Sequence, residues 1–477
     1  CAHWIMADLA IWMARHISVP LYPTLSRTGI HQILEHSQSK ILFVGKLDNF
    51  AEQEAGIPGN VKCICFTAYG ETEGEQWDKL IAENEPLQTI PKRASDELAT
   101  IKYTSGTTGN PKGVMITFGA FNAVTPGALK LYGVKNHGRF FSYLPLSHIA
   151  ERMLVECGAL YSGAQIHFSE SLDKFAENLM HTQPTVFLGV PRIWAKFREK
   201  IELKMPTLDR LLKIPLVSTI IKKAIRKKLG LSKAELIGAG AAPMSVELLE
   251  WFKKIGIVIQ EIYGMTEGLA YSHTNFKDVK FGTVGRAWPD VETRFTEQGE
   301  LLIRHKAMMK GYYREPELTK NVFTEDGFLK TGDKGEVDAD GFLTITGRIK
   351  DQFKTDKAKF VDPAPIELKL SANADIEQVC VVGMGIPQPL ALVVLSAAAK
   401  AKTEAEVIES LKASLEEVNP QLEAYERIKA VVILKQDWTV ENGLMTPTLK
   451  VKRNEVEKIY LPKYPVWYER GQVVMWE

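Results

Sequence analysis

Short runs of β-branched and other apolar residues alternate along this chain with patterns typical of helices. The runs at 40–44, 185–190, 235–237 and 258–262 each end in turn residues and lead into a helical pattern. Strands that alternate with helices usually pair in parallel through crossover connections. The order therefore predicts an α/β fold built on mostly parallel, doubly wound sheets.

The pattern changes at about residue 282. Between residues 282 and 345, short strands are separated by Gly and Asp turns, which predicts an antiparallel β subdomain. A smaller α+β pattern follows residues 347–351, with strands expected at 378–382, 390–395 and 430–434 and an amphipathic helix at 404–418. We expect a large N-terminal domain over 1–349 and a small C-terminal domain over 350–477, with the boundary at Lys350.

Charge and cysteine content exclude some classes of function. The 477 residues carry 59 Lys and Arg against 58 Asp and Glu, so no whole-chain positive field favours nucleic acid as a partner. Five scattered cysteines form no Cys-x-x-Cys pair and no zinc-type cluster with histidine. We therefore expect a reducing, cytoplasmic location and no structural metal.

The most apolar run, residues 2–14, contains Asp8 and is shorter than the roughly 20 residues that a spanning helix needs. We expect a buried helix here. Because the chain starts at Cys1 and enters this hydrophobic element at once, we also expect that a further segment precedes it in the natural protein.

The strongest motif is YTSGTTGNPKG, from Tyr103 to Gly113. Its hydroxyl groups, its three glycines and Lys112 are suited to surround a polyphosphate, because glycine lets backbone N–H groups approach an anion. It differs from a Walker loop because Lys112 precedes Gly113 and no Gly-Lys-Ser/Thr ends the motif. A flexible surface loop is the alternative, but linkers seldom carry this order of residues.

This motif resembles the signature loop of the adenylate-forming (ANL) superfamily. The resemblance continues in order through LPLSH (144–148), GAAP (240–243), YGMTE (263–267), KTGD (330–333), GR (347–348) and PTLK (447–450). Three further segments are similar to the bacterial long-chain fatty acyl-CoA synthetase branch: HIAER (148–152), VPRIW (190–194) and KFVDPAPIE (359–367).

The resemblance implies a two-step reaction that uses ATP, Mg²⁺ and coenzyme A. A fatty acid carboxylate attacks the α-phosphate to give acyl-adenylate and pyrophosphate, and the thiol of coenzyme A then displaces AMP. Two alternatives stay open. The acyl group could pass instead to a carrier-protein thiol, or the chain could bind acyl groups or nucleotides without turnover.

The resemblance also implies a set of site residues. Those that bind ATP or AMP would be Thr104, Ser105, Gly106, Thr107, Thr108, Gly109, Lys112, Gly240, Ala241, Ala242, Tyr263, Gly264, Thr266, Asp333 and Arg348. The catalytic set would be Lys450, Thr266, Glu267 and His148, with Glu267 as the ligand of Mg²⁺. Taken alone, Lys450 reads as a solvated lysine in a basic run, and only the order of the motifs favours a catalytic role.

Lys350 falls where the superfamily has the hinge of its mobile C-terminal domain. The residues Lys357, Ala358 and Lys359 match the loop that contacts coenzyme A, but the bacterial long-chain branch typically has glycine where this chain has Ala358. Glycine permits backbone angles that alanine disfavours. We therefore expect Ala358 to affect thioester formation and not adenylation.

Three weaker signals have competing interpretations. The segment 238–243 differs from a dinucleotide-binding loop because Pro243 replaces the last glycine, so hydride chemistry is not expected. Trp194 and Phe197 would line an acyl tunnel or belong to the core. Residues 200–233 carry ten Lys and Arg and two acids, which suits either peripheral contact with an anionic membrane surface or a solvated helix broken at its two prolines.

Overall fold

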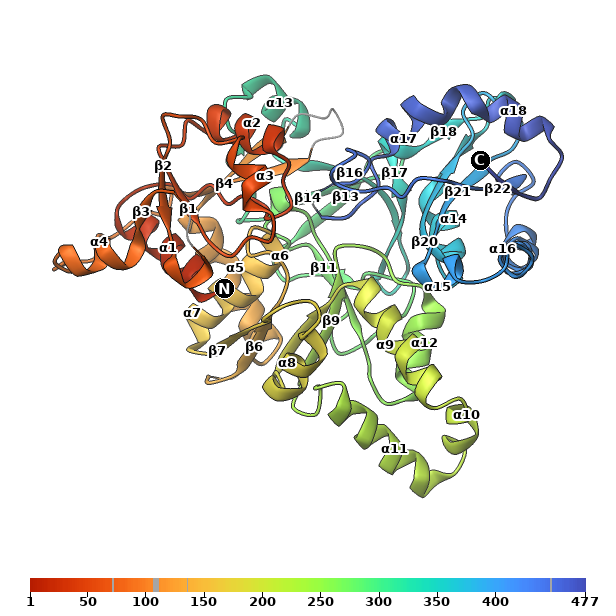
Figure 1. The fold of residues 1–477 in the computed structure, drawn as a ribbon, viewed down its shortest axis with the longest axis horizontal. Helices are drawn as coiled ribbons and strands as arrows, with labels where there is room; N and C mark the ends of the chain where they lie inside the picture. The colour runs from red at the N-terminus through yellow and green to blue at the C-terminus, as the bar shows by residue number, and fades with distance from the viewer. Residues whose placement is uncertain (71–72, 106–110, 135, 447) are drawn as a thin grey trace.

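The computed structural model describes residues 1–70, 73–105, 111–134, 136–446 and 448–477, and all counts below refer to these (Figure 1). Four predicted site residues, Gly106, Thr107, Thr108 and Gly109, lie outside the described residues. The same holds for the proline of the PTLK motif.

The largest sheet of the described chain has seven strands. Their spatial order is β12 (Arg286–Ala287), β11 (His273–Thr274), β10 (Gln260–Tyr263), β9 (Leu236–Gly240), β8 (Val186–Gly189), β6 (Arg139–Ser142) and β7 (Gln165–Phe168). The neighbours from β10 to β7 pair in parallel, and β11 and β12 are antiparallel additions at one edge. The predicted α/β, doubly wound class is confirmed.

One face of this sheet is covered by a group of helices whose apolar residues form a large core. They are α8 (Phe175–Thr182), α9 (Pro191–Lys204), α11 (Pro215–Lys228) and α12 (Val246–Lys254). Trp194 is fully buried in this core and donates from Nε1 to the carbonyl of Gly189 at 3.2 Å, and Phe197 packs beside it. Of the two interpretations of this aromatic pair, the structure supports core packing.

The described chain also forms two smaller three-stranded sheets. One is parallel and consists of β1 (Ile41–Val44), β2 (Lys62–Cys65) and β3 (Glu75–Gln76). The other is antiparallel and consists of β15 (Gly311–Tyr312), β5 (Pro111–Thr117) and β4 (Leu98–Ser105). Because β4 and β5 flank the YTSGTTG motif, Thr104 and Lys112 are direct cross-strand partners.

The predicted antiparallel subdomain is confirmed as a four-stranded sheet in the described chain. It is formed by β13 (Glu292–Phe295), β14 (Glu300–Arg304), β16 (Leu329–Val337) and β17 (Leu343–Arg348).

The last part of the chain is a smaller α+β unit around a mixed sheet. Its strands are β20 (Ile376–Val382), β21 (Leu390–Leu395), β22 (Ala430–Ile433) and β23 (Val474–Trp476). Alternate residues of β21 face opposite sides, so Val393 packs with α14 (Pro363–Leu370) and α16 (Glu404–Val418), while Leu392 packs with α17 (Arg453–Tyr460) and α18 (Tyr464–Glu469). Two helical layers therefore cover this sheet, which lies beside the larger unit in Figure 1.

The helix expected over residues 2–14 exists as α1 (Ala2–Met13), but the expectation that it is buried is wrong for most of its length. Only Ala7 and Asp8 are buried, and Met6 is 44% exposed. The polar residue that interrupts the apolar run is among the best buried, because Asp8 pairs with Arg152. None of the described helices is long and apolar enough to cross a membrane.

Arg152 joins three separate elements inside the protein. It begins the π-helical turn η2 (Arg152–Cys157), pairs with Asp8 of α1 and with Glu156 at 3.1 Å, and donates to Thr100 of β4 at 2.8 Å. All four residues are buried. Removal of one member of such a buried network leaves uncompensated charge, so this cluster ties α1 to the centre of the fold.

The basic segment 200–233 forms the end of α9, then α10 (Leu208–Leu211) and α11. As the second interpretation expected, the helical path is broken near both prolines, and Pro215 occupies the first turn of α11. Figure 1 shows α10 and α11 extending away from the body of the molecule.

Candidate active site

The motif residues gather where the strands of the seven-stranded sheet end. His148 follows β6, Ala241 and Ala242 follow β9, and Tyr263 is the last residue of β10, which pairs in parallel with β9. The carboxyl ends of parallel strands all lie at the same end of the sheet, and ligands of open α/β folds bind at that end. The local turns are tight: Ala241 has a φ of 69°, and a Cβ on Gly264 would lie 2.5 Å from the backbone of Ala270.

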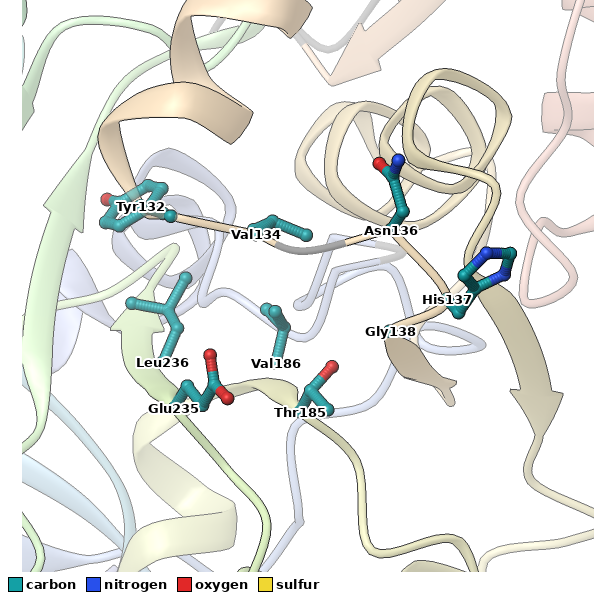
Figure 2. A pocket seen from close by; sticks show the side chains of 10 residues that line it. Tyr132, Val134, Asn136, His137, Gly138, Thr185, Val186, Glu235 and Leu236 are labelled. Atoms are coloured by element: carbon teal, nitrogen blue, oxygen red, sulfur yellow. The ribbon is translucent and has the colours of Figure 1, made fainter.

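A cavity of about 140 Å³ lies at the opposite end of the same sheet, where its parallel strands begin (Figure 2). Its lining residues end α5 (Phe118–Leu131) or precede and begin β6, β8 and β9: Tyr132, Gly133, Val134, Asn136, His137, Gly138, Thr185, Val186, Glu235 and Leu236. Because these are the amino ends of the strands, this cavity is separate from the motif residues.

Asp333 is the centre of a hydrogen-bonded group on the antiparallel sheet. Its Oδ1 accepts from Nε of Arg348 at 2.7 Å, and its Oδ2 accepts from the hydroxyl of Tyr263 at 2.6 Å. Burial, followed by the charge of Asp333, raises the pKa of Tyr263, and the same carboxylate raises the pKa of Arg348. A carboxylate has about four acceptor positions, so Asp333 retains capacity for further hydroxyl donors.

Glu267 lies in the turn η3 (Thr266–Gly268) and is buried. Its Oε1 accepts from the hydroxyl of Tyr312 at 2.8 Å. Nζ of Lys112 lies 5.7 Å from the centroid of the Tyr312 ring. Burial and the charge of Lys350 lower the pKa of Lys112, whereas Glu267 raises it. The acidic residue of YGMTE and the expected hinge lysine therefore act in opposite directions on the pKa of the motif lysine.

Glu267 could bind Mg²⁺ only as a single carboxylate ligand, with water and substrate phosphates as the other ligands. Among the described residues there is no group of three His, Cys, Asp or Glu side chains that could hold a metal. Mg²⁺ commonly takes one or two carboxylates and completes its shell with water and substrate phosphates. The single carboxylate of Glu267, together with the expected phosphate-binding motif, is compatible with this coordination of Mg²⁺.

Lys450 reaches this site from the small C-terminal unit. A tight turn presents it: the amide of Thr446 donates to the carbonyl of Lys450 at 2.8 Å, and Leu449 has a φ of 59°. Lys450 retains solvent exposure, yet the surrounding protein and the charge of Arg348 lower its pKa, while Asp333 raises it. The charges of Arg348 and Asp333, which belong to the antiparallel sheet, therefore act on Lys450 of the C-terminal unit.

His148 caps α6 (Ile149–Glu151) and accepts a hydrogen bond at Nδ1 from the amide of Ala150 at 3.2 Å. Burial, with the charges of Lys102 and Lys450, lowers its pKa to about 3. The imidazole is therefore neutral near pH 7 and contributes polarity and packing, not a positive charge.

Lys350 lies in the turn η4 (Ile349–Asp351) and is exposed. The segment that matches the coenzyme A loop forms the exposed tip of a hairpin between β18 (Phe353–Lys354) and β19 (Phe360–Val361). Ala358 has a φ of 58°, in the left-handed region, and its amide donates to the carbonyl of Thr355 at 3.0 Å. Ala358 therefore adopts a backbone conformation that favours glycine, while its effect on thioester formation and the roles of Lys357 and Lys359 stay predictions.

Sequence analysis missed one charged residue of this region, Lys102. It lies in the middle of β4 and is 3% exposed. The signal was a lysine inside LATIKYTS, a strand that is otherwise apolar or hydroxylic.

Comparison with known proteins places this geometry in a family. A family model described as AMP-binding enzyme matches residues 1–313, and one described as AMP-binding enzyme C-terminal domain matches residues 350–471. The chain belongs to the AMP-binding enzymes. This agrees with the resemblance to the adenylate-forming superfamily seen in the sequence.

Curated relatives of this AMP-binding enzyme include long-chain-fatty-acid--CoA ligase FadD15 of Mycobacterium bovis, which is 29% identical over 98% of this chain and 86% of its own length. Long-chain-fatty-acid--CoA ligase ACSBG2 of Gallus gallus is 26% identical over 99% of this chain and 75% of its own length.

Solved structures show the same fold. The A domain of a carboxylic acid reductase from Segniliparus rugosus has a TM-score of 0.81 at 23% identity and covers 99% of this chain and 82% of its own. The o-succinylbenzoate CoA synthetase of Bacillus subtilis, in complex with its acyl-adenylate, has a TM-score of 0.75 at 22% identity, covering 96% and 86%. The predicted fold class, with its large N-terminal and smaller C-terminal domain, is confirmed.

Proposed function

We propose that this AMP-binding enzyme activates a long-chain fatty acid with ATP and transfers the acyl group to coenzyme A. The relatives named as long-chain-fatty-acid--CoA ligases support the substrate class. The observation that carries the chemistry is the hydrogen-bonded group of Tyr263, Asp333 and Arg348. The charges of Asp333 and Arg348 also act on Lys450, more than one hundred positions later in the chain.

In the first step, a carboxylate oxygen of the fatty acid attacks the α-phosphorus of ATP, and pyrophosphate leaves. Asp333 accepts hydrogen bonds from the ribose hydroxyls, and Tyr263 with the loop 240–242 holds the adenine. Lys112, Thr104, Ser105 and Thr266 bind the phosphates. Lys450 stabilises the charge that develops between the carboxylate and the α-phosphate, where a preorganised cation is most effective. A Mg²⁺ ion held by Glu267 would neutralise phosphate charge.

In the second step, the thiolate of coenzyme A attacks the acyl carbonyl, and AMP leaves. If Lys450 enters the adenylate site from the C-terminal unit in the first step, the two units have to change their relative orientation before the thiol can approach. We place the domain boundary and the pivot at Lys350, and the contact with coenzyme A at the hairpin tip 357–359.

The test is a parallel measurement of pyrophosphate release and thioester formation with a long-chain fatty acid, ATP, Mg²⁺ and coenzyme A. We expect both products in equal amounts. Pyrophosphate without a coenzyme A thioester would favour a carrier-protein acceptor. Binding of ATP and fatty acid with neither product would reduce the chain to a binding protein and refute the proposal.

The segment 200–233 supports a further proposal of peripheral contact with an anionic membrane, from which fatty acids would enter. Four apolar side chains stand in solvent: Leu203, Ile214, Leu216 and Ile220, with exposures of 74%, 51%, 81% and 68%. Exposed Lys223, Lys227 and Lys228 lie on α11, which also carries Leu216 and Ile220. Apolar side chains beside lysines complement the boundary between acyl chains and anionic headgroups.

Vesicle co-sedimentation tests this contact. Lys223→Glu, Lys227→Glu and Lys228→Glu combined should abolish binding to vesicles with anionic lipid, whereas the same reversal at the exposed Lys40, Lys62 and Lys79 should not. Salt should act in the same direction, because the Debye length falls from about 10 Å at 0.1 M to about 3 Å at 1 M. Equal vesicle binding by both triple variants would show that the lysines of α11 make no contact with the membrane.

A further inference from the structure

Lys102 is a buried lysine on the polar face of β4. Residues two apart in a strand face the same side, so Lys102 lies between Thr100, which contacts Arg152, and Thr104 of the phosphate motif. Its Nζ donates to the hydroxyl of Tyr22 at 2.9 Å and to the carbonyl of Tyr103 at 3.4 Å. Within the described chain these are its hydrogen-bond partners, and no described carboxylate pairs with it.

The surroundings of Lys102 are those of the reacting groups. Burial lowers its pKa to about 7, Glu267 raises it, and Arg152 and Lys450 lower it further. The low pKa of His148 has Lys102 and Lys450 among its causes. The charges of residues from η3 and from the C-terminal unit therefore act on Lys102, which lies on the same face of β4 as Thr104 of the phosphate motif.

The nearby carboxylates already have partners of their own. Asp8 and Glu156 pair with Arg152, and Glu267 accepts from Tyr312. A buried ammonium without a paired anion is costly because burial removes its water, so the protonated form of Lys102 is disfavoured in spite of the charge of Glu267. An anion supplied by the substrate would relieve that cost.

We propose that Nζ of Lys102 binds the carboxylate of the fatty acid and remains beside the acyl carbonyl after adenylation. This inference rests on the function proposed above and adds a second cation with a different task from Lys450. Lys450 belongs to the C-terminal unit, which has to move between the two steps. Lys102 belongs to a strand of the large unit, so it holds the substrate in both orientations.

The test compares a fatty acid with the primary alcohol of equal chain length, both bound without ATP. Lys102→Met should weaken binding of the acid about ten- to a hundredfold, the usual range for one charged hydrogen bond, and leave alcohol binding unchanged. Retained alcohol binding also shows that the variant is folded. Lys102→Arg should recover part of the affinity for the acid. The exposed Lys130→Met is the matched control and should change neither ligand.

Tyr22→Phe separates binding from structure, because it removes a partner of Nζ and keeps the charge. It should bind the acid within a few-fold of the unmodified chain. Equal loss of acid and alcohol in Lys102→Met, or unchanged selectivity in that variant, would overturn the inference while leaving the proposed function intact. If the unmodified chain binds the acid no better than the alcohol and releases no pyrophosphate, the proposed function fails and the inference fails with it.

Discussion

Nε of Arg348 lies 2.7 Å from Oδ1 of Asp333, and the two residues are direct partners across β16 and β17. The antiparallel register therefore sets the geometry of the group that we assign to the ribose. A slip of one residue would turn one of the two side chains to the other face of the sheet.

Asp333→Asn should raise the KM for ATP about ten- to a hundredfold, because hydrogen bonds to a charged group contribute roughly 1.5 to 3 kcal/mol. The KM for fatty acid should change little. The matched control is Asp340→Asn, an exposed position in the turn before β17, which should behave like the unmodified enzyme. An unchanged KM for ATP in Asp333→Asn would remove Asp333 from the nucleotide site.

Ala358→Gly tests the strained hairpin tip. Relief of the left-handed conformation is worth about 1 to 2 kcal/mol, and the added freedom of the unfolded chain costs roughly 0.4 to 1 kcal/mol. The free energy of unfolding should rise, whereas Ala401→Gly, at a φ of −89°, should lower it. If Ala358 also crowds coenzyme A, the affinity of the Ala358→Gly variant for coenzyme A should be higher by about five- to thirtyfold at most. Destabilisation by both variants alike would show that the loop is unstrained.

Lys350→Pro tests the pivot. Proline fixes φ near −65°, so it should hold the two units in one orientation and slow one half-reaction far more than the other. Lys350→Ala retains backbone freedom and should support both. Pyrophosphate release and thioester formation from preformed acyl-adenylate are the two measurements. Small parallel losses in the proline variant would place the hinge elsewhere.

Arg152→Met should lower the free energy of unfolding by about 3 to 5 kcal/mol, because the buried carboxyl groups of Asp8 and Glu156 would both lose their cationic partner. Denaturant unfolding measures this. Lys79→Met, at an exposed pair with Glu83, should change it by less than about 1 kcal/mol. Adding Asp8→Leu and Glu156→Leu to Arg152→Met should recover much of the loss. A loss of less than about 1 kcal/mol in the single variant would contradict the role of the network.

Elements with strong local signals were predictable from the sequence. The strand at 390–395 and the helix at 404–418 were expected at the bounds that the structure shows, since the helix starts at a capping box in which Thr403 and Glu406 bond reciprocally. The expectation of a buried helix at the start of the chain was wrong, because apolar composition does not reveal how much of a helix its neighbours cover.

Long-range relationships were less accessible. Lys450 was identified only through the order of the motifs, since the effect of Arg348 and Asp333 on its pKa depends on how the two units meet. Lys102 was missed because a lysine is normally exposed, whereas here its side chain is buried against Tyr22, which lies 80 positions earlier in the chain.

The most direct test of the central claim is the effect of Lys450→Ala on each half-reaction, with the neighbouring Lys452→Ala as control. Pyrophosphate release with fatty acid and ATP should fall by about two to three powers of ten, corresponding to roughly 2.7 to 4 kcal/mol for one preorganised contact. Thioester formation from preformed acyl-adenylate should persist. Equal loss of both half-reactions, or full pyrophosphate release in Lys450→Ala, would contradict the assignment of this lysine to adenylation.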